Sequence, residues 1–501
     1  MPSLPYQPLR VLFVTSECTP FAMTGGLGDV SSALPIALRS LGVDARVVLP
    51  LYQGVDRSRL ELLPGTLMVP LGSAHIAARV WRGWLRHGVQ VYFIEHDAFF
   101  DRPAIYGPNG GAFGDNLVRF AFLSRAVIEL PRLLGWTPDV IHANDWQTAL
   151  APVYLDTIER NGALARCASL LTIHNIGYQG IFPIEEIGAT GLEFLHPRTL
   201  EHFGSLNLLK GGLCHSTLLS TVSRSYSREV QTSAFGCGLE GVLRSRTDDL
   251  FGILNGIDTE EWDPRTDPFL PAHYGVDSMT GKAECKAALQ RNAGLPERPY
   301  VPMIGVISRL THQKGMDVLA RTLSRILELD VQIVLLGAGD SDAERFFDEA
   351  TRTHSDKFRG WVGGFDQRRA HLIEAGCDFL LMPSRYEPCG LNQMYSLRYG
   401  TLPIVRATGG LDDTIDNYDE RTGEGTGFKF IDLNPSTLYD VIGWAVSTWY
   451  DRPHHVRQMQ ERGMQMDFSW TPAARQYEQV YYAALRRRRQ VPSFEAAQAQ
   501  P

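Results

Sequence analysis

A loop motif in the C-terminal half of the chain reads Pro383-Ser384-Arg385-Tyr386-Glu387-Pro388-Cys389-Gly390-Leu391-Asn392-Gln393. The short apolar run at 377–382 before it is typical of a buried parallel strand. Residues 391–399 after it have helical spacing and end before Gly400, a residue type common just past a helix. The motif is therefore expected in a strand-to-helix loop at the carboxyl edge of an α/β sheet, where such sheets bind ligands.

The chemistry of this loop suits a charged sugar donor. Its carboxylate, Glu387, precedes Gly390 at the expected helix start, so it can face a sugar while backbone amides face phosphates. An isolated Glu-Pro is more often an acidic residue beside a turn. The functional interpretation therefore depends on a donor site elsewhere in the chain.

The overall composition limits the class of protein. A chain of 501 residues is too long for one ordinary core and predicts two large domains. Hydrophobic residues make up 44% and charged residues 21%, which is typical of a soluble globular protein. The net charge of −8 gives no support for a nucleic acid or membrane partner. The basic run at 486–489 is expected to be a solvated tail, with a patch for an anionic partner as the alternative.

The cysteines and the N-terminus predict the compartment. Seven cysteines are scattered without a Cys-x-x-Cys pair, which favours a reduced cytoplasmic protein over a disulfide scaffold. No spacing of cysteine and histidine indicates a metal site. The first ten residues lack the apolar core of a signal peptide, and no apolar run reaches membrane-spanning length. We expect a cytoplasmic protein with no metal cofactor.

A glycine-rich turn lies near the N-terminus. A strand is predicted at 11–15, a helix at 31–41, and between them Thr24-Gly25-Gly26-Leu27-Gly28-Asp29-Val30. This arrangement lets backbone N–H groups approach a diphosphate without interference from side chains. It matches neither the Gly-x-Gly-x-x-Gly fingerprint nor a Walker loop, so a nicotinamide or ATP site has no direct support.

Alternating strands and helices continue through the first half. Helices are expected at 116–130 and 148–159, and the alternation indicates a parallel sheet covered on both faces. Polar residues follow three of the strands and should share the ligand edge, which suggests a lined cleft. The strands are predicted at 45–49, 89–95, 139–143, 169–173 and 218–222, and the polar ends are Glu95-His96-Asp97, His142-Ala143-Asn144-Asp145 and His174-Asn175.

A second alternating series follows a segment at 262–280 that is rich in Asp, Pro and Gly and is interpreted as a linker. Its strands are expected at 300–307, 332–336, 360–362, 378–382 and 402–405. The prediction is an α/β protein with two doubly wound Rossmann-like domains that face each other across a deep cleft. We set the domains at 1–255 and 256–480, and a helix end with a tail at 481–501.

A basic loop follows the first predicted strand of the second domain. Ser308-Arg309-Leu310-Thr311-His312-Gln313-Lys314-Gly315 places Arg309 and Lys314 around a turn before a helix. Two cations beside a helix N-terminus can clamp a diphosphate and stabilise a departing nucleoside diphosphate without a metal. An exposed basic loop is the alternative.

Taken together, these segments resemble the bacterial glycogen synthases and plant starch synthases. The resemblance extends from about Val11 to Tyr482 and implies a GT-B fold and retaining transfer of glucose. It also implies that domain 1–255 is the acceptor side and domain 256–480 the nucleotide-sugar side. Besides the three loops quoted above, it rests on Asn144-Asp145-Trp146-Gln147-Thr148, Thr172-Ile173-His174-Asn175, Leu209-Lys210-Gly211-Gly212, Thr221-Val222-Ser223 and Ile253-Leu254-Asn255-Gly256-Ile257-Asp258.

The resemblance also implies roles for matching residues. Arg309 and Lys314 would neutralise the donor diphosphate, and Glu387 would lie beside the transferred glucose, as nucleophile or as a stabiliser of positive charge. Phe365 would stack on the base. The remaining donor residues would be Met23, Gly25, Gly26, Asp29, Asn255, Cys389, Gly390, Leu391 and Asn392, and the residues on the sugar and acceptor side would be His174, Asn144 and Asp145.

Three positions depart from the family pattern. Met23 stands where a lysine usually precedes Thr-Gly-Gly-Leu, and the loss of that cation should weaken donor binding. Asn144 stands where bacterial members commonly have histidine, although the plant starch synthases also have asparagine there. Asn392 stands where threonine is frequent in bacterial members. Tyr395, eight residues after Glu387, stands where many other GT-B transferases have a second glutamate, which argues against the sucrose- and trehalose-type relatives.

The sequence therefore predicts a cytoplasmic glycogen synthase that uses ADP-glucose and an α-1,4-glucan. A related GT-B glycosyltransferase with another nucleotide-sugar donor or a small acceptor is the alternative among enzymes. The alternative of another class is an inactive glucan-binding paralogue.

Overall fold

The computed structural model describes residues 8–108, 111–194 and 199–490, and within them the chain divides into two units. The first comprises the residues up to Val222, residues 227–256, and the chain from Trp470 onward. The second comprises residues 223–226 and 257–469. The C-terminal boundary predicted at 480 is therefore wrong, because the last helix begins at Trp470 and packs with the first unit.

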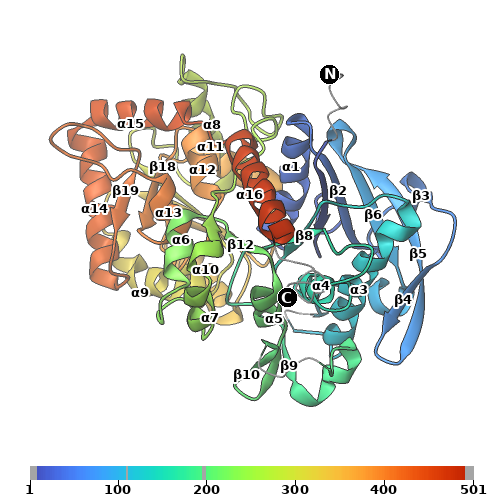
Figure 1. The fold of residues 1–501 in the computed structure, drawn as a ribbon. Helices are drawn as coiled ribbons and strands as arrows, with labels where there is room; N and C mark the ends of the chain where they lie inside the picture. The colour runs from blue at the N-terminus through green and yellow to red at the C-terminus, as the bar shows by residue number, and fades with distance from the viewer. Residues whose placement is uncertain (1–7, 109–110, 195–198, 491–501) are drawn as a thin grey trace. The chain divides into compact units, whose positions relative to one another are not determined.

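Parallel strands form the centre of the first unit (Figure 1). The strand order is β13-β12-β8-β7-β1-β2-β6-β5-β3, with β4 paired to β5. These strands are β1 Arg10–Val14, β2 Asp44–Pro50, β3 Glu61–Leu62, β4 Leu67–Leu71, β5 Ala74–Trp84, β6 Gln90–Glu95, β7 Val140–Asn144, β8 Ala168–Ile173, β12 Leu218–Thr221 and β13 Leu250–Gly252. A small antiparallel sheet contains β9 Ile181–Pro183, β10 Glu201–His202 and β11 Ser205–Asn207.

One edge of this sheet differs from the prediction of parallel strands alone. β5 pairs antiparallel with β3, β4 and β6. Exposed and buried positions are mixed along it, and the polar residues His75, Arg79 and Arg82 interrupt its sequence, so the segment lacks the continuous apolar run that marks a central parallel strand. The core strands β1, β2 and β6 to β8 match the predicted ones within two residues at either end.

The helices of the first unit are α1 Gly26–Ser40, α2 Asp97–Phe100, α3 Asn116–Leu134, α4 Leu150–Asp156, α5 Leu208–His215, α7 Glu240–Ser245 and α16 Trp470–Gln490; α6 Arg224–Glu229 begins among the residues grouped with the second unit. The glycine turn is shorter than predicted, because α1 starts at Gly26 rather than at residue 31. Helix α16 packs against α1, β7 and β8.

The basic run at 486–489 is not a solvated tail. It forms the last turn of α16, where Arg487 pairs with Asp249 and Arg488 with Asp156. These pairs tie the last turn of α16 to the rest of the first unit. The rest of the predicted tail, residues 491–501, lies outside the described residues.

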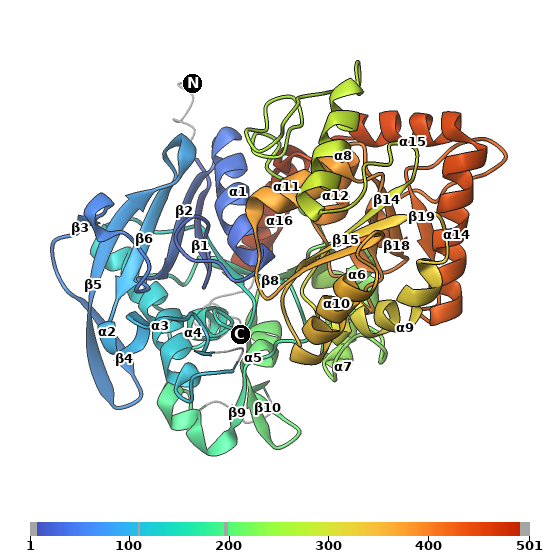
Figure 2. The same ribbon diagram turned by 180° about the vertical axis from the view of Figure 1, so that it is seen from behind.

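The second unit contains a fully parallel sheet whose strand order is β16-β15-β14-β17-β18-β19 (Figure 2). This is the doubly wound order 3-2-1-4-5-6. The strands are β14 Met303–Ile307, β15 Gln332–Gly337, β16 Phe358–Val362, β17 Phe379–Met382, β18 Leu402–Arg406 and β19 Phe428–Phe430. The helices are α8 Thr280–Ala293, α9 Met316–Ile326, α10 Ser341–Thr353, α11 Gln367–Gly376, α12 Asn392–Arg398, α13 Gly409–Thr414, α14 Pro435–Asp451 and α15 Pro453–Gln465.

The segment predicted as a linker is instead packed into the second unit. Leu270 and Tyr274 are buried in a cluster with Tyr399 and Met464. Trp262 stacks between His371 and Tyr395, with ring centroids 3.8 and 3.9 Å away. Its Asp, Pro and Gly residues form local turns, and its apolar residues supply the buried contacts.

Among the described residues, none of the helices combines the length and the apolar character needed to span a membrane.

Candidate functional site

The motif around Glu387 lies where it was predicted, between β17 and α12. The Glu387 side chain is 7% exposed, and its Oε2 atom lies 2.5 Å from Lys314 Nζ. Ser384 Oγ donates a second hydrogen bond of 2.9 Å to the same oxygen. Both donors hold one carboxylate oxygen, so the other oxygen stays available to a ligand.

Lys314 comes from the second predicted loop, between β14 and α9. The two loops pack tightly at Gly315, whose φ is 73° and whose hypothetical Cβ would lie 2.0 Å from Pro383 O. Arg385 N donates to Gln313 O at 2.8 Å, which fastens the loops together. Arg309 is exposed, and its guanidinium lies 3.4 Å from Gln313 Oε1. The structure therefore places both predicted cations in one loop beside the carboxylate loop.

A glycine pair behind Glu387 was not singled out in the sequence. Gly409 and Gly410 open α13, and Gly410 N donates to Glu387 O at 3.1 Å. A Cβ on Gly410 would lie 2.0 Å from Cys389 O, and a Cβ on Gly409 the same distance from Glu387 O. The missed signal is Thr408-Gly409-Gly410-Leu411, which repeats the tetrapeptide at 24–27.

The other residues of the second unit that were predicted to bind the sugar donor lie after Glu387 and, in the case of Phe365, after β16. Cys389 is buried, Gly390 has φ 71°, and Leu391 precedes the first residue of α12. Asn392 Nδ2 donates to Ile307 O at 2.8 Å, which fixes the start of α12 against the end of β14. Phe365 lies after β16 with 66% of its surface exposed, so its ring is open to a flat ligand.

Backbone amides of the glycine turn in the first unit already bind a carboxylate of the protein itself, that of Glu17. Glu17, 4% exposed, accepts from Thr24 N at 2.6 Å, Thr24 Oγ1 at 2.7 Å and Gly25 N at 3.1 Å. Tyr106 OH donates to it at 2.5 Å. The Gly25 amide, predicted to face a diphosphate, therefore donates to a carboxylate, whereas the Gly26 amide forms no hydrogen bond with Glu17. Sequence reasoning missed Glu17, although it follows β1 at the ligand edge.

Two further predicted residues flank this turn. Met23 is 52% exposed, and its sulfur accepts from Thr19 Oγ1 at 3.3 Å. The same hydroxyl lies 3.2 Å from Asp29 Oδ1 in the first turn of α1. A side chain at position 23 is thus directed over the start of α1 with solvent on one side.

The ends of β7 and β8 come together as predicted. His174 N donates to Asp145 Oδ1 at 2.7 Å, and His174 Nε2 lies 2.9 Å from Asn144 Oδ1. Burial raises the pKa of Asp145 to about 7, against the lowering effect of the His174 and Asn175 amides. Burial also lowers the pKa of His174 to about 3, so its ring is neutral at neutral pH.

The third polar strand end does not join this cluster. β1 and β2 lie between β6 and β7 in the sheet. Glu95 at the end of β6 accepts from Arg79, Arg57 and Trp81 Nε1, so its carboxylate is used within the fold. Asn255 is 5% exposed, and its Oδ1 is buried without a hydrogen-bond partner among the described residues.

Tyr395 has a structural role at the position where other GT-B transferases carry glutamate. It is 7% exposed and stacks on Trp262 at an interplanar angle of 12°. His371 stacks on the opposite face of the same indole and bonds Asp267 Oδ2 at 2.8 Å. The three rings fix α12 to α11 and to the segment at 262–280.

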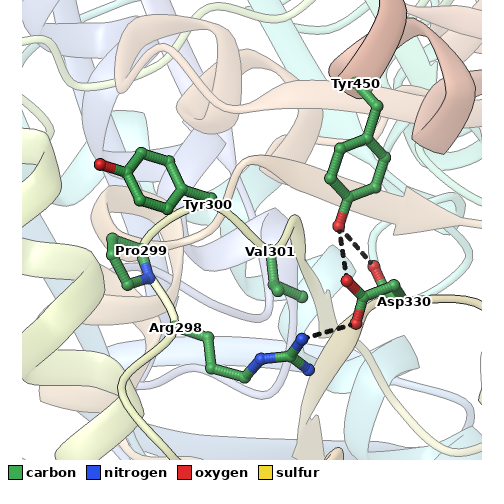
Figure 3. Close-up of a pocket in the computed structure, with 6 residues that line it drawn as sticks. All are labelled: Arg298, Pro299, Tyr300, Val301, Asp330 and Tyr450. Carbon is green, nitrogen blue, oxygen red and sulfur yellow. Dashed lines mark hydrogen bonds and ion pairs between the residues drawn. The ribbon is translucent and has the colours of Figure 1, made fainter.

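A surface cavity of about 310 Å³ in the second unit is not part of this site (Figure 3). It lies at the amino ends of β14 and β15, the sheet edge opposite Arg309 and Glu387. Asp330 there is paired with Arg298 at 2.9 Å and with Tyr450 OH at 3.1 Å. Across the described residues, no group of three or more His, Cys, Asp or Glu side chains is placed to hold a metal ion.

Comparisons with known proteins agree with this architecture. The sequence model of the starch synthase catalytic domain matches residues 10–245, and that of the group 1 glycosyl transferases matches residues 291–463. A glycogen synthase 1 of Geobacter metallireducens is 48% identical over 96% of this chain and 97% of its own. A glycogen synthase of Anaeromyxobacter dehalogenans is 46% identical over 94% and 98%.

A solved structure matches nearly the whole chain. The catalytic domain of starch synthase IV from Arabidopsis thaliana, bound to ADP and acarbose, superposes with a TM-score of 0.87 at 34% identity. The match covers 96% of this chain and 100% of that one. Two Rossmann-like domains with these loops define a glycosyltransferase of the GT-B class. Within that class, the chain belongs to the glycogen and starch synthase family.

Proposed function

We propose that this enzyme transfers glucose from ADP-glucose to the non-reducing end of an α-1,4-glucan, with retention of configuration and release of ADP. The observation that carries the proposal is the buried Glu387 carboxylate held by Lys314 beside Arg309, at the carboxyl ends of neighbouring strands. The bacterial relatives are named glycogen synthases, and the matched starch synthase is bound to ADP and acarbose.

The chemistry requires stabilisation of two opposite charges. As the bond to the sugar breaks, negative charge grows on the diphosphate and positive charge on the glucose ring. Arg309 and Lys314 supply the cations for the first, and loss of either should lower the rate on the order of 10²-fold. Lys314 is bound to Glu387 in this structure, so we infer that the diphosphate competes with this carboxylate for the ammonium group.

Glu387 stabilises the second charge in this proposal. Lys314 and Ser384 both bind Oε2, so the unbonded oxygen faces the sugar with its lone pairs. Within the second domain, Phe365 stacks on the base and Cys389, Gly390, Leu391 and Asn392 line the sugar and phosphate pocket. In the first domain, Met23, Gly26, Asp29 and Asn255 contact the donor, and His174, supported by Asn144 and Asp145, contacts sugar. In this proposal the Gly25 amide stays bonded to Glu17 and supports the loop rather than a phosphate.

No metal takes part in this scheme, because the two cations replace the charge that a metal would supply. We also propose a cytoplasmic location, as predicted from cysteine usage.

The experiment is incorporation of labelled glucose into glycogen, with ADP-glucose and UDP-glucose compared in the presence of a chelator. Rapid transfer from ADP-glucose by the wild type, and its loss in a folded Glu387→Gln variant, would support the proposal. Preference for UDP-glucose would keep the reaction and overturn the donor, an outcome that Met23 makes worth measuring. Absence of transfer from either donor would favour a binding protein.

A further inference from the structure

His174 has one bonded ring nitrogen and one unbonded ring nitrogen. Nε2 lies 2.9 Å from Asn144 Oδ1. Within residues 8–108, 111–194 and 199–490, no group forms a hydrogen bond with Nδ1. The side chain is partly buried at the carboxyl end of β8, where ligands of parallel sheets bind. The chemical character of Nδ1 therefore determines what this position can recognise.

The orientation of the Asn144 amide follows from its other neighbours. Its nitrogen lies 2.9 Å from Val14 O and 3.3 Å from His142 O. Both neighbours are backbone carbonyls, which accept hydrogen bonds and cannot donate them. A flipped amide would place oxygen against two oxygens in a fully buried position. The amide nitrogen must therefore face the carbonyls, and Oδ1 must face His174.

This orientation fixes the tautomer of the histidine. Oδ1 of an amide only accepts, so Nε2 must carry the proton of the hydrogen bond between them. Burial keeps the imidazole neutral at neutral pH by lowering its pKa to about 3. A neutral ring with a proton on Nε2 has a lone pair and no proton on Nδ1. Nδ1 is consequently a hydrogen-bond acceptor.

We propose that Asn144 is a positioning residue that fixes His174 as the Nε2–H tautomer, so that Nδ1 accepts a hydrogen bond from a hydroxyl group of the sugar substrate. The inference deepens the proposed function and rests on it for the identity of the ligand. A phosphate oxygen has no proton to give to Nδ1 at neutral pH, whereas every free sugar hydroxyl has one. The tautomer thus directs this position toward sugar rather than diphosphate.

The surrounding contacts hold this arrangement rigidly. Thr148 Oγ1 accepts from Asn144 N at 2.6 Å and donates to Asn144 O at 2.8 Å. Asp145 Oδ1 accepts from the backbone of His174 at 2.7 Å. Consecutive residues of one strand end therefore fix the ring and the backbone of the same histidine. Such support is what keeps a recognition group within the narrow geometry that binding requires.

The direct test is ¹⁵N NMR of the full-length protein labelled in its histidines, without substrate. The His174 signals are identified by their absence in a His174→Gln variant. The expected spectrum shows a proton-bearing Nε2 and an unprotonated Nδ1. A proton on Nδ1 would overturn the proposal, whether or not the protein transfers glucose. This readout needs no substituted Asn144, so an unstable variant cannot leave the question open.

The second test asks what the acceptor recognises. Asn144→Leu removes the amide oxygen at similar size, and Thr148→Val is the matched control, because it removes a buried hydrogen bond at Asn144 without removing that oxygen. Asn144→Leu should weaken ADP-glucose binding, or raise the KM for maltotriose, on the order of 10-fold. Binding of ADP, which lacks the glucose, should be unchanged. Thr148→Val should keep the tautomer signature and the ratio of ADP-glucose to ADP affinity.

The outcomes separate this inference from the proposed function. Equal weakening of ADP and ADP-glucose in Asn144→Leu, or no change in either sugar measurement, would overturn the sugar assignment. A protein with the expected tautomer that binds maltotriose but transfers no glucose would contradict the proposed function and leave the inference standing.

Discussion

Ser384 is the residue that determines how the Glu387 carboxylate is presented. The residue is 1% exposed, and its hydroxyl donates to Glu387 Oε2, the oxygen that Lys314 also binds. We predict that Ser384→Ala lowers kcat on the order of 10-fold, because the carboxylate loses the donor that fixes its orientation while the charge pair remains. Ser396→Ala is the control, since its hydroxyl is also buried but bonds only Gln393 O in α12. Equal kcat values in the two variants would contradict a positioning role for Ser384.

Replacement of Met23 by lysine should change the affinity for the sugar donor. Its side chain is half-exposed beside the start of α1, so a lysine there can extend without burying its charge. Met23→Lys should lower the KM for ADP-glucose several-fold by adding a cation near the donor phosphates. Met68→Lys, at a similarly exposed position in β4, controls for the change in net charge. An unchanged or higher KM in Met23→Lys would mean that the pocket compensates for the methionine.

Asp145 and His174 have opposite effects on the pH dependence of stability. Folding raises the pKa of Asp145 from about 4 to about 7 through burial, so its contribution is full below pH 4 and is lost as the pH rises to 7. Folding lowers the pKa of His174 from about 6.5 to about 3, so its contribution is full above pH 6.5 and is lost as the pH falls to 3. Between about pH 4 and 6.5 the two contributions oppose each other.

We therefore predict that Asp145→Asn uncovers the histidine contribution. Relative to the wild type, the free energy of unfolding of this variant should gain on the order of 1.4 kcal/mol per pH unit between pH 4 and 6.5. Asparagine still accepts from the His174 amide and tolerates the φ of 55° at this position. Denaturant midpoints at intervals from pH 4 to 8 measure the effect. Parallel curves for variant and wild type would show that Asp145 does not titrate in this range.

The element that supports the Glu387 loop is the start of α13. Gly410→Ala should destabilise the second unit by about 1–3 kcal/mol and lower activity, because its Cβ would overlap Cys389 O. Gly443→Ala is the matched control, since this glycine lies within α14 with no atom near its hypothetical Cβ. The control should be neutral or more stable, by up to about 1 kcal/mol. A stable, active Gly410→Ala variant would show that the loop does not depend on this close contact.

The sequence predicted the elements whose signals are local. The central strands are continuous apolar runs with loops at their carboxyl ends, and β17 and α12 lie within two residues of their predicted bounds. Strand β5, near one edge of the sheet, was not predicted because about half of its residues face solvent. Arg309, Lys314 and Glu387 were found because each loop has its own motif. Their mutual pairing needed the register of β14 with β17.

Other features depend on contacts between distant residues and leave no local signal. The segment at 262–280 resembles a linker in composition, yet Trp262 is held by residues more than 100 positions later. The engagement of the Gly25 amide depends on the return of the chain toward Glu17 after a tight turn. The basic run at 486–489 has the composition of a tail, and only its acidic partners in the first unit make it structural.

At the scale of the whole molecule, the last described helix returns to the unit in which the chain began. Helix α16 buries Tyr477 and Tyr481, and Tyr481 OH lies 2.8 Å from His142 Nδ1 in β7. Two residues further along β7, Asn144 contacts His174. The final helix is therefore part of the support of the first domain's ligand edge, although it follows the second domain in the sequence.

The arginines at the basic end of α16 differ in their contacts. Arg488 is largely buried and donates to Asp156 at 3.0 Å and to Ala165 O at 3.1 Å, whereas Arg486 is exposed and belongs to none of these pairs. Arg488→Ala should destabilise the first unit by about 1 kcal/mol, because Asp156 loses a cation and keeps only His215. This corresponds to a decrease in Tm of about 2–4 °C. Arg486→Ala should leave Tm unchanged. If both substitutions lowered Tm equally, the effect would come from net charge on the helix, and if neither did, the end of the chain would behave as the solvated tail that its composition suggests.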